Sequence, residues 1–209
     1  MGLFGKKESC AICGEKLSML SKFPVLDGVI CRNCLSKCTQ YLTLPQNRSI
    51  EEIKRNIEEN DENKALYATF APKEIGDGLY ADFSNKLWCV GDKTALKNNA
   101  AYIFHFSDIS SYEFMEDGKT ITKSGAGSAV AGGLLFGGIG LVAGGLMGRK
   151  SKDVINKMSV IINVNNEWTN KVEVKIITTE TKKGGAMYNL AKSAFESIVA
   201  NLDMMIQNA

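Results

Sequence analysis

Apolar and polar residues alternate in short runs from residue 79 onward, a pattern typical of half-buried β-strands. Two of these runs flank Asp117-Gly118, a dipeptide that favours a tight hairpin turn. We therefore expect an antiparallel sheet of about seven strands in this part of the chain. The expected strands are 79–83, 86–90, 102–106, 110–116, 119–123, 158–164 and 172–176.

Two segments have helical periodicity instead. Ser49 and Glu52 form a Ser-x-x-Glu capping box, so we expect a connecting helix over 49–68 that frays near Asn60–Asn63. A second helix should follow Gly184-Gly185 and bury one apolar stripe. That stripe is expected to contain Met187, Leu190, Ala194, Ile198, Leu202 and Met205. About seven antiparallel strands closed by a C-terminal helix is the element order of a pleckstrin-homology-like (PH-like) barrel.

The first forty residues contain two Cys-x-x-Cys pairs. Cys10 and Cys13 form the first pair, and Cys31 and Cys34 form the second. Thiolates spaced in this way bind one tetrahedral zinc ion, and four of them leave no open position for a water molecule. We therefore expect one structural zinc ion, Gly14 providing a tight turn after the first pair, and a short helix that runs from Cys31 through Tyr41.

Two other interpretations of the cysteines remain open. A Cys-x-x-Cys pair also serves in redox chemistry, although two pairs at this spacing favour metal binding. Cys38 is a fifth cysteine near the second pair, and we expect it to be a free or partly buried thiol. No secretory signal is visible at the start of the chain, so we expect a reducing compartment, the cytoplasm.

Residues 124–148 carry no charge and are rich in glycine. Small residues recur at every fourth position, which is typical of helices that pack closely within membranes. We expect a hairpin of two short helices, 124–135 and 139–148, because strands on both sides should pair in one barrel. The hairpin should contact a membrane or another copy of the chain through Gly133, Gly137, Gly140, Gly144 and Gly148.

Basic residues surround the base of this hairpin: Lys123, Arg149, Lys150 and Lys152. They suit anionic lipid headgroups or nucleic-acid phosphate. Two alternatives for the segment remain open, a soluble hairpin packed on its own barrel and a flexible glycine-rich loop.

The charge distribution bears on the partner. The net charge is only +2, which argues against bulk electrostatic binding of nucleic acid, although residues 1–48 are locally basic. His105 is the single histidine, and the sequence contains no nucleophile motif and no paired carboxylates. We therefore expect a protein that is not an enzyme.

The stretches Cys10-Ala11-Ile12-Cys13-Gly14 and Leu26-Asp27-Gly28-Val29-Ile30-Cys31-Arg32-Asn33-Cys34-Leu35 resemble an uncharacterised bacterial and phage zinc-ribbon family (domain of unknown function 4428 type). Members of that family often carry a bacterial PH-like or GRAM-like domain further along the chain. Residues 70–123 and 157–206 are similar to such domains in pattern. The resemblance implies no activity.

Together these features predict an α+β protein with three parts. They are a four-cysteine zinc-ribbon or treble-clef module (1–45), a linker helix (46–69) and a PH-like domain (70–209) that contains the glycine-rich insertion (124–150). We expect a non-enzymatic adaptor that binds a protein or lipid surface, in the cytoplasm or at the inner face of the membrane. One alternative is a zinc-ribbon protein that binds nucleic acid, and another is a membrane-perturbing effector that forms homo-oligomers through 124–148.

Overall fold

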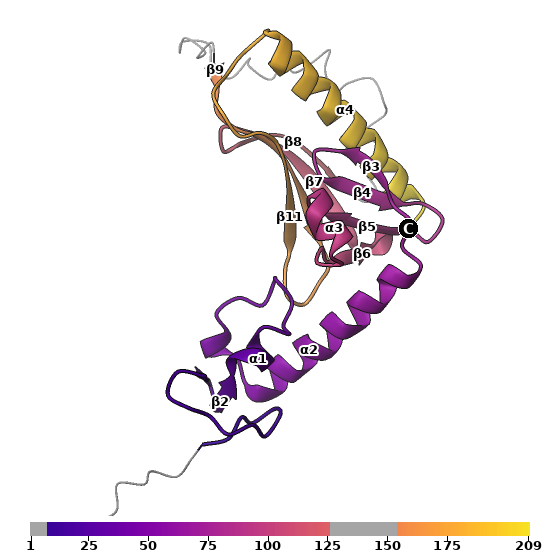
Figure 1. The fold of residues 1–209 in the computed structure, drawn as a ribbon. Coiled ribbons are helices and arrows are strands. Elements are labelled where there is room, and N and C mark those ends of the chain that lie inside the picture. Colours follow the sequence, from indigo (N-terminus) through magenta and orange to yellow (C-terminus); the bar gives the residue numbers. More distant parts are fainter. Residues whose placement is uncertain (1–7, 126–153) are drawn as a thin grey trace, which may run out of the picture. The chain divides into compact units, whose positions relative to one another are not determined.

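A computed structural model describes residues 8–125 and 154–209 (Figure 1). The chain divides into two compact units, Met1–Ala68 and Thr69–Ala209. Helices and antiparallel sheets are both present, which confirms the α+β class. The expected helical hairpin lies outside the described residues and stays a prediction.

The first unit contains one small hairpin and one long helix. Strands β1 (Lys22–Val25) and β2 (Gly28–Cys31) pair antiparallel, and helix α1 (Arg32–Leu35) follows directly. A 3-10 turn at Pro45–Asn47 precedes helix α2 (Ile50–Ala65). A second 3-10 turn, Leu66–Ala68, ends the unit.

Helix α1 ends at Leu35 rather than at the expected Tyr41. The chain leaves the helix because the backbone N–H of Thr39 donates a hydrogen bond to Asn56 Oδ1 of α2 at 2.8 Å. The side-chain amide of Asn56 returns a bond to Thr39 Oγ1 at 3.0 Å. Both residues are buried, so this pair fixes the segment after α1 against α2.

Helix α2 begins at the expected capping box. The backbone N–H of Ser49 donates to Glu52 Oε2 at 2.8 Å, and the backbone N–H of Glu52 donates to Ser49 Oγ at 3.2 Å. The expected fraying near Asn60–Asn63 was wrong, because α2 continues to Ala65. The side chain of Asn60 donates a hydrogen bond to the carbonyl of Lys37 at 2.7 Å, which joins this part of α2 to the segment after α1.

The second unit contains two four-stranded antiparallel sheets (Figure 1). The first has the order β3-β4-β5-β6 and the second the order β11-β10-β7-β8. The first consists of β3 (Lys73–Gly76), β4 (Leu79–Asp82), β5 (Leu87–Val90) and β6 (Ile103–His105). The second consists of β7 (Ile109–Glu116), β8 (Lys119–Gly125), β10 (Met158–Val164) and β11 (Lys171–Ile177).

Four shorter elements were not expected from the sequence. They are strand β3, helix α3 (Lys93–Lys97), and the two-residue strands β9 (Val154–Ile155) and β12 (Thr181–Lys182), which pair with each other. The 3-10 turn Phe106–Asp108 connects β6 to β7. Helix α4 (Ala186–Gln207) follows β12 and packs along β3 and β11.

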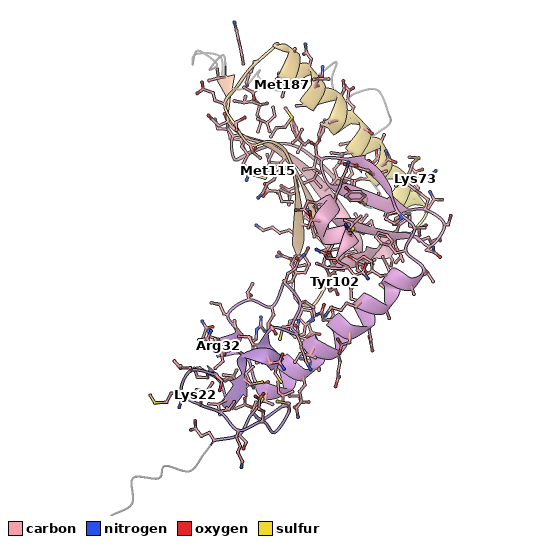
Figure 2. All side chains as sticks on the ribbon, viewed as in Figure 1. Lys22, Arg32, Lys73, Tyr102, Met115 and Met187 are labelled. Atoms are coloured by element: carbon pink, nitrogen blue, oxygen red, sulfur yellow. The ribbon has the colours of Figure 1, made fainter. Side chains whose placement is uncertain are left out.

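The apolar stripe of α4 differs from the expected one in its first half. Met187 and Leu190 are 69% and 65% exposed, and Met187 projects from the start of the helix (Figure 2). The ring of Phe195 packs on Phe114 of β7, with centroids 4.3 Å apart, so this contact lies on the buried face of α4. The buried residues are Ala191, Phe195, Ile198, Val199, Leu202 and Met205.

Two strand patterns also depart from strict alternation. Ile103 and Phe104 are both buried on β6, where Phe104 stacks on Trp88 with centroids 4.8 Å apart. At the end of β11, Ile177 is buried in place of Ile176, because the register with β10 shifts by a bulge beside Met158.

The two anchors of the glycine-rich insertion lie on opposite sides of β7. Strand β8 ends at Gly125 opposite Ser111, and β10 begins at Met158 opposite Glu116. Both anchors therefore belong to one sheet, as expected. Ser111 and Glu116 are five residues apart on β7, so the anchors are separated by about 17 Å along the strand direction.

Replacing residues 126–148 with a Gly/Ser linker should leave the second unit folded. A linker of about six residues together with 149–153 spans the distance between the anchors, and loop closure changes the free energy of unfolding by less than about 1 kcal/mol. Thermal or urea unfolding followed by circular dichroism measures this. A molten or insoluble product would show that the insertion forms part of the core.

Candidate metal centre

The four predicted cysteines come from two short turns of the first unit. Cys10 and Cys13 lie in a turn that Gly14 completes with φ at +75°, and its N–H donates to the carbonyl of Cys10 at 2.8 Å. Cys31 is the last residue of β2 and caps α1, and Cys34 lies within α1. A hairpin and one helical turn therefore present the second pair.

The four sulfur atoms lie within 4.8 Å of one another. The Cys10 and Cys34 sulfurs are 3.8 Å apart, and those of Cys13 and Cys31 are 3.7 Å apart. A tetrahedral zinc ion with Zn–S bonds of about 2.3 Å places its ligands about 3.8 Å apart. The cluster can therefore bind a metal ion, and its dimensions and donor atoms fit zinc.

Backbone amides of the same turns donate to the sulfurs. The N–H of Cys31 donates to Cys10 Sγ at 3.2 Å, and the N–H of Cys34 donates to Cys31 Sγ at 3.3 Å. Cys10, Cys31 and Cys34 are buried, whereas Cys13 is exposed. Such amide–sulfur bonds orient metal-binding thiolates and stabilise their charge.

The pKa values show how the thiols differ. Burial raises the pKa of Cys31 and Cys34, and the neighbouring thiols raise that of Cys34 further. For Cys10 burial also acts to raise the pKa, but hydrogen bonds from the backbone of Cys13, Cys31 and Ile12 lower it to about 6. One thiolate is therefore readily formed, and a bound cation would offset the charge of the others.

The remaining two cysteines lie apart from the cluster. Cys38 is half-buried with its sulfur 3.9 Å from the carbonyl oxygen of Cys34, and burial raises its pKa to about 11. Cys89 is buried on β5, and burial raises its pKa to about 12. Within 8–125 and 154–209, the four-cysteine group is the only set of three or more His, Cys, Asp or Glu residues placed to share a metal ion.

An apolar cluster supports the cysteines, and part of it comes from α2. Ile53 of α2 is fully buried against Val25, Ile30 and the three buried cysteines. Ile50, Ile53 and Ile57 are spaced along one face of α2, and all three lie in or against this cluster. The helix expected as a linker therefore packs on the metal-binding module.

The other predicted site residues have different outcomes. The glycine ridge and Arg149, Lys150 and Lys152 lie outside the described residues, and the side chain of Lys123 is not described. His105 is exposed, and its backbone N–H donates to Asp108 Oδ2 at 2.8 Å. Trp88 and Trp168 are buried.

Comparison with known families agrees with this architecture. Residues 47–182 match the family described as glycine zipper containing PH domain, and residues 8–56 match a domain of unknown function, DUF4428. The first match covers more than half of the chain, so the chain belongs to the glycine-zipper-containing PH domain family. The resemblance proposed from the cysteine motifs is confirmed, with both domains in the expected order.

Both matches include residues 47–56, so they overlap at the first part of α2. No curated protein and no solved structure matches the chain. In the part of the chain that the structure describes, no helix is long and apolar enough to cross a membrane.

Cys34→Ser should abolish metal binding, because three thiolates cannot complete the tetrahedron. We expect the metal content to fall from one ion per chain to near zero, together with loss of structure in residues 10–40. Elemental analysis of the purified protein measures the first effect. Cys38→Ser is the matched control and should keep its metal; loss of metal in this variant would show that the ligand set is wrong.

Proposed function

We propose that this protein is a non-enzymatic adaptor that binds a surface through its PH-like domain and glycine-rich segment. The first unit is held by a structural zinc ion bound to Cys10, Cys13, Cys31 and Cys34. The observation that carries the proposal is the pairing of β7 with β8 on one side and β10 on the other. The four strands of this sheet pair with one another within the described residues, and the proposal assigns binding to the glycine-rich segment between β8 and β10.

A lipid surface is the partner that the chemistry favours. Residues 124–148 carry no charge, and basic residues follow at Arg149, Lys150 and Lys152. Apolar side chains with basic flanks match the acyl region and the anionic headgroups of a bilayer. A protein surface is the alternative, and the same experiment separates the two.

A binding role is also supported by the character of the metal centre. Four thiolates fill the coordination sphere of a tetrahedral ion, so no position remains for a substrate or a reactive water. Three of the four sulfurs belong to buried residues of the module's apolar cluster. The metal therefore stabilises a module that is too small to fold on its apolar core alone.

Flotation with anionic vesicles should separate the intact chain from the linker variant described above. We expect the intact chain to float with vesicles that contain phosphatidylglycerol, and the variant to lose at least tenfold in partition coefficient. The loss follows from removal of the apolar side chains that would enter the bilayer.

If the linker variant unfolds as the intact chain does and also floats equally well, the glycine-rich segment is excluded as the lipid contact. If neither chain floats, the partner is not a lipid surface. In both cases the unfolding measurement on the same samples shows that the PH-like domain is intact.

Gly144→Leu tests the packing of the segment. Leucine raises both helix propensity and apolarity, so partition into vesicles should stay level or improve. Close packing between helices should be lost, because a leucine side chain does not fit where two backbones meet. Crosslinking on vesicles should therefore show less self-association for Gly144→Leu and no change for the control Leu146→Ala. Equal crosslinking of Gly144→Leu and the wild type would contradict close packing at the glycines.

A further inference from the structure

The turn Ser18–Ser21 of the first unit exposes two apolar side chains. Met19 is 88% exposed and Leu20 is 86% exposed, the two highest values among the exposed large apolar residues of the described chain. A single exposed apolar residue is ordinary, but two adjacent ones at the tip of a turn are unusual.

The backbone of this turn is nevertheless firmly held. The N–H groups of Ser21 and Lys22 both donate to the carbonyl of Ser18 at 3.2 Å, and the N–H of Ser18 donates to Ser21 Oγ at 2.8 Å. From outside the turn, Arg32 donates through its backbone N–H to Ser21 O at 3.0 Å and through Nε to Leu20 O at 3.1 Å. The turn therefore holds Met19 and Leu20 outward instead of allowing them to fold onto the module.

Positive charge lies directly beside the exposed pair. The Arg32 guanidinium contacts the backbone of the turn, and Lys22 follows the turn at the start of β1 (Figure 2). Lys22 also contacts Glu8 at 3.2 Å, so part of its charge is offset locally. Lys16 precedes the turn and is exposed, and it is fixed by a β-bridge to Ser9.

We infer that the Ser18–Ser21 turn is a membrane-contact site at which Met19 and Leu20 enter the interface of an anionic bilayer. Lys16, Lys22 and Arg32 then face the lipid headgroups, where cations are favourable. This site lies in the first unit and does not depend on the proposed role of the glycine-rich segment.

The shape and charge of the turn favour a bilayer over a protein partner. A protein interface needs a contiguous surface of several hundred Å² on each side, whereas two side chains on a projecting turn offer little area. A bilayer interface accepts a small apolar projection and gains from the adjacent cations. The four-cysteine cluster gives the turn a rigid base, since Arg32 is directly next to Cys31.

Vesicle binding of the full chain with its metal bound tests the site. We expect Met19→Ser/Leu20→Ser to lower the partition coefficient on vesicles of 30% phosphatidylglycerol in phosphatidylcholine by about tenfold or more, since burial of one such side chain corresponds to roughly tenfold. The matched control is Met187→Ser/Leu190→Ser, which removes one exposed methionine and one exposed leucine from α4 of the second unit. The control should bind as the wild type does.

A tryptophan at position 19 gives a direct readout. The native Trp88 and Trp168 are buried in the second unit, so Met19→Trp adds the one exposed indole. Its emission should shift to shorter wavelength on anionic vesicles and be quenched by brominated acyl chains. Raising the NaCl concentration from 0.1 M to 0.5 M should weaken binding, because the Debye length falls from about 10 Å to below 5 Å.

Three outcomes would overturn the site: Met19→Ser/Leu20→Ser binding as the wild type with its metal retained, equal losses in the control pair, or a Met19→Trp emission that vesicles do not change.

Testing the same substitutions in the linker variant separates this site from the proposed function. If the linker variant alone keeps wild-type binding, the proposed role of 124–148 fails while the turn stands. If only the Met19→Ser/Leu20→Ser variant keeps wild-type binding, the turn fails as a membrane-contact site and the proposed role of 124–148 stands.

Discussion

The pairing of β8 and β10 with the two sides of β7 is the constraint on which the second unit depends. These strands run in the same direction, so the chain between them must travel from one end of β7 to the other. The chain belongs to a family described as glycine zipper containing PH domain, and the glycine-rich residues 124–148 lie in this connection. Within the described residues, the hydrogen bonds of this sheet join β7, β8, β10 and β11 to one another.

The first unit depends on a different feature, its small core around the cysteines. Its apolar core is small, and three buried cysteines with Ile30 and Ile53 form most of its centre. A bound metal ion would supply the stabilisation that so little apolar surface does not. Helix α2 adds Ile53 to the core and the buried Asn56–Thr39 pair beside it. The module therefore extends beyond the cysteines into the helix that carries the chain to the PH-like domain.

The parts of this structure that the sequence predicts are those with local causes. The Cys-x-x-Cys spacing, the Ser49–Glu52 capping box and the Asp117-Gly118 turn each define their geometry within a few residues. Strands β9 and β12 could not be predicted in this way, because each pairs with a strand that lies far away in the sequence. Strand β3 pairs with the adjacent β4 across Asp77-Gly78, a local turn signal that was missed.

Side-chain partners explain the remaining errors. The expected stripe of α4 began with Met187 and Leu190, but the helix buries Ala191 and Phe195 there, and Phe195 packs on Phe114. Asn60 was expected to lie where α2 frays, but both Asn60 and Asn56 bond to Lys37 and Thr39 of the segment after α1. The exposure of Met19 and Leu20 could not be predicted either, because two adjacent apolar residues in a short turn do not show whether their side chains face the core or the solvent.

Hydrogen–deuterium exchange of the full chain with and without anionic vesicles tests the central claim most directly. If the glycine-rich segment binds a lipid surface while the sheet remains unchanged, amides of 124–148 gain protection on vesicles and those of β7 do not change. The claim would be contradicted if 124–148 gained no protection, or if protection in β7 were lost when the vesicles bind.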